Sequence, residues 1–171
     1  GKDKEEIEIA LRNNILQFNI ESEEELYDIY EIAKKYKITA NICLRINPDI
    51  APNTHKKIST GEKETKFGID LEKIISIYEK LHELDYINPV GLGVHIGSQI
   101  FDFSFFQRAY SNLKSIADNL KKSGYKVPTL DLGGGIGIHY KGNDKPNFND
   151  YKKIISKLFL NSDYKLSFEP G

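Results

Sequence analysis

The chain has 171 residues, of which 39% are hydrophobic and 29% are charged, a composition that is ordinary for a globular domain with a core of its own. Its 24 basic and 25 acidic residues give a net charge of −1, which excludes a strongly basic surface that would attract nucleic acid or an anionic membrane. Because the sequence has neither a long apolar run nor a signal-peptide pattern, we expect no transmembrane helix and no leader.

Hydrophobic periodicity predicts helices and strands in alternation along the chain. In chain order we predict a helix over 2–14, a strand over 15–20, a helix over 22–35, a strand over 39–46, a helix over 70–81, a strand over 89–96, a helix over 103–122, a strand over 129–132, a helix over 149–160 and a strand over 165–168. Ser22 and Glu25 form the pattern of a capping box, and Asp70 is a candidate cap for the third helix. The polar, patternless segment 52–66 is typical of a lid or a binding loop.

The predicted strands are short and continuously apolar rather than alternating, which is typical of a parallel sheet with helices outside it. A doubly wound sheet and a (β/α)8 barrel both fit this order of elements. The chain has no internal repeat, no low-complexity segment and no linker, and it is shorter than the ~250 residues of a complete barrel. We therefore expect one α/β domain of one of these two kinds.

Three consecutive glycines, residues 133–135, follow the predicted strand over 129–132. Such a run packs no side chain and costs backbone entropy, so it is tolerated where the backbone bends sharply or approaches something closely. Peptide N–H groups just past a strand end form a nest that suits an anion, most often phosphate. A plain tight turn explains the same residues, so this run by itself leaves both interpretations open.

Polar groups stand at the C-terminal ends of all the predicted strands. They are Asn19 and Glu21, Arg45, His95 and Ser98, the glycines 133–135, and Glu169. In parallel α/β folds this rim binds ligands, and a charged side chain at the tip of a buried strand is costly without a partner. Together these groups predict a ligand site at the rim.

Each of these residues also has a purely structural interpretation. Arg45 fits an ion pair, His95 fits a core histidine bonded to backbone, and Ser98 fits a cap. Glu169 precedes a proline and fits a turn. Cys43, the single cysteine, lies in an apolar run, so we expect a buried structural thiol in a reducing, cytoplasmic compartment. The sequence shows no closely spaced His, Cys, Asp and Glu set, and we predict no metal site.

Recognisable motifs run nearly from end to end of the chain. They are Phe18-Asn19-Ile20-Glu21-Ser22, Arg45-Ile46-Asn47-Pro48-Asp49, Thr54-His55, Ile58-Ser59-Thr60-Gly61, Lys66-Phe67-Gly68-Ile69, His95-Ile96-Gly97-Ser98-Gln99, Leu130-Asp131-Leu132-Gly133-Gly134-Gly135 and Glu169-Pro170-Gly171. In this order they resemble the barrel domain of the alanine-racemase-like family of pyridoxal-phosphate enzymes. Within that family, residues 58–61 and Gln99 look more like the diaminopimelate decarboxylase branch than the ornithine and arginine decarboxylases.

The resemblance implies that pyridoxal 5'-phosphate is the cofactor, and it gives roles to the matching residues. Glu169 would face the pyridine nitrogen and keep it protonated, and His95 would stack on the ring, so that both are catalytic. The phosphate would be held chiefly by Ser98, Gly135 and the backbone at Gly171. The implied cofactor-binding set is Arg45, His95, Ser98, Gly133, Gly134, Gly135, Glu169, Pro170 and Gly171.

Other parts of the family pattern are missing from the chain. The lysine that bonds to the cofactor belongs to an early strand, and a Cys-Glu-Ser motif belongs to a C-terminal β domain; neither motif is present. The chain also has no methionine. We therefore expect residues 1–171 to be the later part of the barrel, about five of its eight strands, with the early strands and the β domain absent. Alone, such a chain is expected to fold poorly and to be inactive.

The implied function is decarboxylation of meso-2,6-diaminopimelate to L-lysine, the last step of lysine biosynthesis, by a cytoplasmic homodimer with no nucleic-acid or membrane partner. Three alternatives stay open. They are a decarboxylase of another basic amino acid such as ornithine or arginine, a non-catalytic pyridoxal-phosphate-binding relative, and an unrelated phosphate-binding barrel enzyme.

Overall fold

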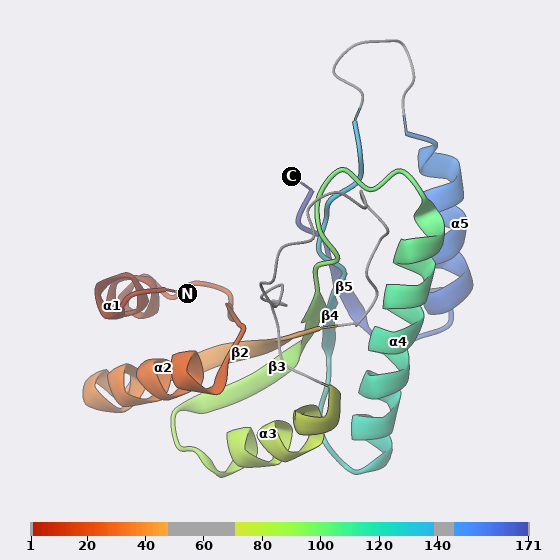
Figure 1. The fold of residues 1–171 in the computed structure, drawn as a ribbon. Helices are drawn as coiled ribbons and strands as arrows, with labels where there is room; N and C mark the ends of the chain where they lie inside the picture. Colours follow the sequence, from red (N-terminus) through yellow and green to blue (C-terminus); the bar gives the residue numbers. More distant parts are fainter. Residues whose placement is uncertain (1, 48–70, 139–145, 171) are drawn as a thin grey trace, which may run out of the picture.

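The computed structural model describes residues 2–47, 71–138 and 146–170, apart from the side chains of residues 71 and 72 (Figure 1). Its elements in chain order are α1 (Lys4–Arg12), β1 (Phe18–Ile20), α2 (Glu23–Tyr36), β2 (Ala40–Ile46), α3 (Leu71–Glu83), β3 (Ile87–Val94), α4 (Phe103–Lys122), β4 (Thr129–Asp131), α5 (Phe148–Phe159) and β5 (Lys165–Ser167). The strands form one parallel sheet in the order β1-β2-β3-β4-β5. The predicted α/β class and alternation of elements are confirmed.

Alternate residues of the strands face opposite sides of the sheet, and the helix-covered side is apolar. On β2, Ile42, Leu44 and Ile46 are at most 1% exposed and belong to one core with the inner faces of the helices. The residues between them face the other way. Cys43 lies there beside Gly93 and Asp131, because a Cβ built on Gly93 would be 3.4 Å from the Cys43 sulfur and 3.1 Å from the Asp131 Cβ. The thiol is fully buried, as predicted.

All five strands differ from their predicted bounds, β1 and β3 by more than one residue. β1 begins at Phe18 rather than at residue 15, and Ile15 and Leu16 before it are exposed. β3 runs over Ile87–Val94 rather than 89–96, and its pairing with β2 slips by one residue near Pro89. Proline has no backbone N–H to donate to the neighbouring strand, and the bulge allows β3 to continue past Pro89 in spite of this missing hydrogen bond. His95 therefore lies just past the strand end.

Side-chain caps start the helices where the sequence allows them. Ser22 is the N-cap of α2 and accepts a hydrogen bond from the Glu25 N–H at 3.2 Å. The predicted capping box is incomplete, because the Glu25 carboxylate accepts the N–H of Glu21 rather than that of Ser22. The reciprocal box is found instead on α1, between Asp3 and Glu6.

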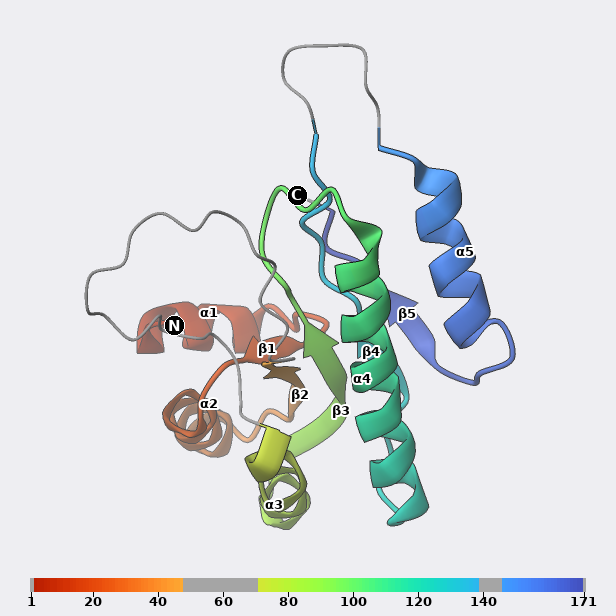
Figure 2. The same ribbon diagram turned by 45° about the vertical axis from the view of Figure 1, so that its right-hand side comes forward.

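The sheet curls so strongly that its two edge strands come together at their C-terminal ends. The amide nitrogen of Asn19, on β1, lies 2.8 Å from a carboxylate oxygen of Glu169, just after β5. These strands are the first and last in the order of the sheet, yet a hydrogen bond joins their side chains across the concave face. Figures 1 and 2 show the helices packed around the outside of this curve. A flat open sheet does not allow such a contact, so the curvature favours the barrel over the doubly wound alternative.

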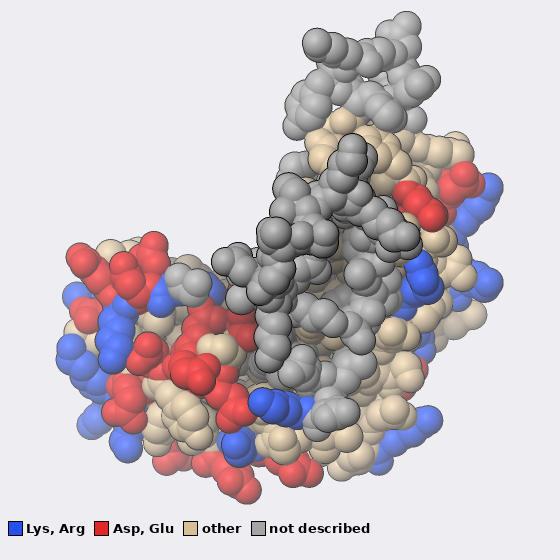
Figure 3. Space-filling model, in the orientation of Figure 1, with Lys and Arg blue, Asp and Glu red and all other residues tan. Residues whose placement is uncertain are grey.

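Charged side chains of both signs mix on the outer surface. On the face drawn in Figure 3, acidic and basic residues lie side by side over α1 and α2. Ion pairs join these two helices, including Lys4 with Asp28 and Lys35 with Glu8. None of the described helices has the length and apolarity to cross a membrane.

Several sequence predictions fall outside the described residues. They are the lid over 52–66, the cap Asp70, the motifs over 58–61 and 66–69, and the cofactor-binding Gly171.

Candidate functional site

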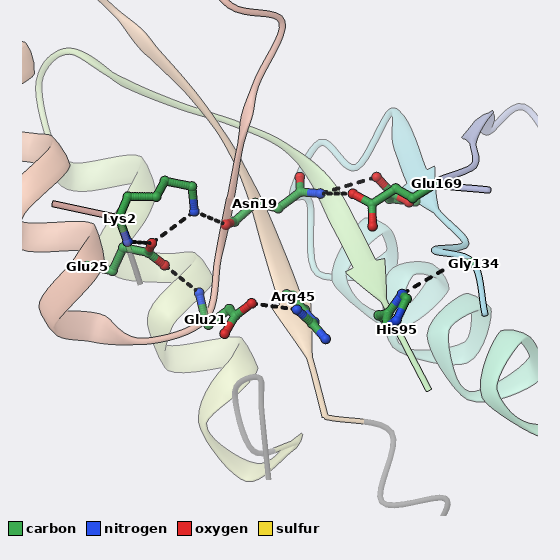
Figure 4. A network of polar contacts seen from close by, with 9 residues as sticks. Lys2, Asn19, Glu21, Glu25, Arg45, His95, Gly134 and Glu169 are labelled. Carbon is green, nitrogen blue, oxygen red and sulfur yellow. Dashed lines mark hydrogen bonds and ion pairs between the residues drawn. The ribbon is translucent and has the colours of Figure 1, made fainter. Parts of the chain in front are cut away.

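The polar groups predicted at the strand ends lie together along the C-terminal rim of the sheet. Figure 4 shows Asn19, Glu21, Arg45, His95 and Glu169 converging from four different strands. The backbone N–H of Glu169 donates to the Gly133 carbonyl at 2.9 Å, which places the carboxylate and the glycine run on the same rim. A ligand bound at this rim can therefore contact the carboxylate and the glycine run at the same time.

The carboxylate of Glu169 is held by a neighbouring amide. The Asn19 Nδ2 atom donates to Glu169 Oε1 at 2.8 Å and lies 3.3 Å from Asp131 Oδ2. Asp131 is only 4% exposed, and its other oxygen accepts the N–H of Gly133 at 2.9 Å. One amide group therefore bridges two carboxylates at the floor of the site.

His95 carries an imidazole that is neutral at pH 7. Its Nδ1 atom lies 3.4 Å from the Gly134 nitrogen and accepts that N–H, so the ring proton is on Nε2. Burial lowers the pKa of His95 below the ordinary 6.5, and the positive charge of Arg45 lowers it further. The Glu169 and Asp131 carboxylates oppose this shift without reversing it. A neutral ring with a fixed orientation suits stacking better than a solvated cation.

Arg45 forms an ion pair with Glu21, so the structural interpretation given to this arginine is realised. The Glu21 N–H in turn donates to Glu25 Oε2 at 2.9 Å, and Lys2 Nζ lies 2.9 Å from Glu25 Oε1. These contacts fix the turn that follows β1. Arg45 still lies close enough to His95 to influence its pKa, so a role beside the site is compatible with this pair.

Two of the three glycines are required by close backbone contacts. Gly133 has φ +63°, and a Cβ there would lie 2.2 Å from the Val94 carbonyl oxygen. Gly135 has φ +96°, and its Cβ would lie 1.8 Å from the Gly97 carbonyl oxygen. The N–H groups of Gly133 and Gly134 are already engaged by Asp131 and His95, so of the two interpretations left open for the glycine run, an open nest does not hold at these two residues.

The loop that carries Ser98 is tied to the glycine loop. The Ile100 N–H donates to the Gly135 carbonyl at 2.9 Å, and the Gln99 side chain accepts the Ile138 N–H at 2.9 Å. Ser98 is exposed, and a Cβ built on Gly97 would meet nothing within 4 Å. The two loops therefore form one unit, on which Ser98 is exposed. Pro170 is exposed next to Glu169.

Sequence reasoning placed Asn19 on the rim but gave it no task, and it missed Asp131 as a site residue. The signal for Asp131 was a single acidic residue between two leucines of a buried strand, where a charge needs partners. Asn19 has no comparable local signal, because its partner is 150 positions away in the sequence. Among the described residues, no group of three or more His, Cys, Asp and Glu is placed to hold a metal ion.

Comparison with known proteins decides the family. The family model described as "Pyridoxal-dependent decarboxylase, pyridoxal binding domain" matches residues 1–171. The chain belongs to this family. Among the curated relatives of this pyridoxal-dependent decarboxylase domain, the diaminopimelate decarboxylase of Zymomonas mobilis is 42% identical over 173 residues, and that of Aquifex aeolicus is 40% identical over 172.

The alignments cover 100% of this chain but 41% of each of those two relatives, so the chain spans about two fifths of their length. A solved structure of the Helicobacter pylori diaminopimelate decarboxylase complexed with L-lysine is 37% identical, with a TM-score of 0.89. It is matched over 100% of this chain and 43% of its own. The predicted pyridoxal-phosphate-binding barrel fold is thereby confirmed.

The residues at the rim fit pyridoxal phosphate. A carboxylate at Glu169 suits a protonated pyridine nitrogen, and the neutral imidazole of His95 suits the face of the ring. At Gly135 the backbone passes so near Gly97 that no side chain fits, and Ser98 on the joined loop is exposed. This combination of a carboxylate, a flat ring and a glycine-serine loop on one edge matches the three parts of the cofactor.

Proposed function

We propose that this chain forms the later part of the cofactor-binding barrel of a diaminopimelate decarboxylase, which converts meso-2,6-diaminopimelate to L-lysine in lysine biosynthesis. The relatives that carry this name align over the whole chain at 35–42% identity. The observation that carries the proposal is the placement of Glu169 on the same rim as His95 and the glycine loop. Pyridoxal phosphate, when bound, supplies the electron sink that decarboxylation at an amino-acid α-carbon needs.

Each rim residue then has a task set by its own chemistry. Glu169 accepts the hydrogen bond of the ring nitrogen and keeps that nitrogen protonated, while His95 covers one face of the ring. Ser98, Gly135 and the backbone at Gly171 hold the phosphate, Gly133 and Gly134 shape the loop, and Pro170 links Glu169 to Gly171 in the sequence. Arg45, held by Glu21, adds positive charge beside the ring.

The cofactor-bonding lysine and the C-terminal β domain lie in parts of the protein outside residues 1–171. The full-length enzyme is a homodimer. It works in the cytoplasm, as a single buried cysteine and mixed surface charges favour.

The decisive experiment replaces Glu169 by Gln in the full-length enzyme. We expect kcat for release of carbon dioxide from meso-diaminopimelate to fall about a hundredfold, because a neutral amide stabilises the protonated ring nitrogen far less than a carboxylate does. Pyridoxal phosphate binds with little change in Kd. Glu5→Gln, an exposed substitution on α1, is the matched control and leaves turnover unchanged. Unchanged turnover in Glu169→Gln would refute the role of this carboxylate.

Substrate competition separates the alternatives. The wild-type full-length enzyme is assayed with meso-diaminopimelate, ornithine and arginine at equal concentrations. We expect kcat/KM to be highest for meso-diaminopimelate. A higher value for ornithine or arginine assigns the chain to another basic amino acid, and bound cofactor without carbon dioxide release identifies a non-catalytic relative.

A further inference from the structure

The Asn19 side chain has a fixed orientation between a donor and two acceptors. Gln17 Nε2 donates to Asn19 Oδ1 at 2.8 Å, so the Asn19 Nδ2 group is turned toward the carboxylates. It donates to Glu169 Oε1 at 2.8 Å and approaches Asp131 Oδ2 at 3.3 Å. Reversing this amide would place its oxygen against both acids, which electrostatics forbids.

The backbone of Asn19 is rigidly held. It pairs in register with Cys43 on β2, whose side chain is fully buried. On its other side, Lys2 Nζ donates to the Asn19 carbonyl at 2.9 Å and to Glu25 Oε1 at 2.9 Å, as Figure 4 shows. A side chain on a strand that is fixed from both sides is a precise support for a neighbouring group.

Glu169, in contrast, needs such support. It lies after the last residue of β5 and is exposed, and its backbone is fixed by the bond from its N–H to the Gly133 carbonyl. Within the described part of the chain, the hydrogen bond recorded for its carboxylate comes from Asn19. Without this bond, the Glu169 side chain is free to change rotamer, and its carboxylate loses the fixed position that a catalytic contact needs.

We propose that Asn19 is a positioning residue that fixes Glu169 for its contact with the cofactor; this inference rests on the function proposed above. The amide engages Oε1 and restricts rotation of the carboxylate, so Oε2 would be the oxygen that serves the ring nitrogen of the bound cofactor. Asn19 reaches Glu169 across the concave face from the opposite edge of the sheet, so the curl of the barrel itself aims the carboxylate.

The test is a double-mutant cycle in the full-length holoenzyme with Asn19→Ala, Glu169→Gln and the double variant. The readouts are kcat, KM, the Kd of pyridoxal phosphate and the pH midpoint of the visible absorbance of the bound cofactor. We expect Asn19→Ala to lower kcat about tenfold with KM within about twofold, and to lower the pH midpoint by about one unit, since one unit corresponds to a tenfold change. In the Glu169→Gln background, we expect Asn19→Ala to change kcat by less than about twofold and to leave the pH midpoint nearly unchanged.

Asn19→Asp distinguishes positioning from space filling. The aspartate has the same shape but no N–H to donate, and it adds a like charge beside two carboxylates. We expect Asn19→Asp to lower kcat at least as much as Asn19→Ala. The matched control is Asn41→Ala on β2, which removes an amide that donates to the Leu16 carbonyl at 2.9 Å and leaves the readouts unchanged.

Two results would overturn the proposal: equal effects of Asn19→Ala in both Glu169 backgrounds, or wild-type behaviour of Asn19→Asp. Failure of the proposed function is recognised separately. An enzyme that binds pyridoxal phosphate but releases no carbon dioxide from meso-diaminopimelate disproves the substrate assignment. The cofactor Kd and the pH midpoint then still report whether Asn19 supports Glu169.

Discussion

His95 shows at the scale of one residue how its surroundings set its protonation. Burial and the Arg45 charge lower its pKa, so the folded protein binds this proton less tightly than the unfolded chain does. Its contribution to stability is therefore complete above pH 6.5, the ordinary value, and is lost as the pH falls below it. Acidification charges the ring and weakens its acceptance of the Gly134 N–H.

We predict that opposite substitutions move this pKa in opposite directions. In the cofactor-free enzyme, Arg45→Gln raises the pKa of His95 because a neighbouring positive charge is lost. Glu169→Gln lowers the pKa because a stabilising negative charge is lost. NMR titration of the ¹⁵N-labelled histidine measures both. Shifts of the same sign in the two variants would contradict the arrangement of charges around the ring.

The glycine at 135 provides a second prediction at this scale. Gly135 and Gly124 have similar φ values, +96° and +93°, but a Cβ at Gly124 meets nothing within 4 Å, whereas one at Gly135 would overlap the Gly97 carbonyl. We expect Gly124→Ala to cost about 1 kcal/mol for the left-handed backbone, and Gly135→Ala to cost about 2 kcal/mol more for the clash. Urea unfolding of the full-length protein measures both, and Gly135→Ala alone also weakens cofactor binding. Equal losses would show that the two loops can separate freely.

At the scale of elements, a partly buried ion pair joins the residues just before α1 to α2. The Glu25 carboxylate is almost fully buried, and Lys2 Nζ lies 2.9 Å from its Oε1 atom. Burial on its own raises the pKa of Glu25, but the bonds from Lys2 and from the Glu21 N–H outweigh it, and the pKa lies below the ordinary 4.5. The resulting stability is present above pH 4.5 and is lost as the pH falls through the lowered pKa.

We predict unequal effects for two lysines at this end of α1. Lys2→Met lowers the free energy of unfolding at pH 7 by about 1.5 kcal/mol, because a hydrogen bond to a buried charge is lost. Lys4→Met, which removes an exposed pair with Asp28, changes it by less than about 0.5 kcal/mol. Chemical denaturation of both variants tests the difference. Equal changes in the free energy of unfolding would show that the bond from Lys2 to Glu25 adds no more stability than an exposed ion pair.

At the scale of the whole molecule, the curl of the sheet creates the site and leaves two edges. The Asn19–Glu169 bond closes the rim, but in the described residues β1 and β5 each pair with a strand on one side only. Unpaired strand edges invite association with other chains. The curl of the five described strands therefore both forms the site and leaves the backbone of β1 and β5 unpaired on one side.

We predict that residues 1–171, expressed alone, self-associate and release no carbon dioxide from meso-diaminopimelate. Size-exclusion chromatography with light scattering measures the first property, and a carbon dioxide assay measures the second. The full-length enzyme in the same buffer is the control. An isolated chain that is monomeric and active would show that these edges need no further strands.

The order of helices and strands, the polar rim and its carboxylate Glu169 could be predicted from the amino-acid sequence, because apolar periodicity, strand-end polarity and glycine runs are local signals. The predicted bounds of α4, 103–122, are confirmed, whereas β1 begins only at Phe18, and β3, whose pairing with β2 shifts near Pro89, ends at Val94. The bond from Asn19 to Glu169, the place of Asp131 in the site and the engagement of two glycine N–H groups are visible only in the folded chain. The reason is physical: these bonds join residues brought together by the curvature of the sheet, and curvature is a property of all the strands at once.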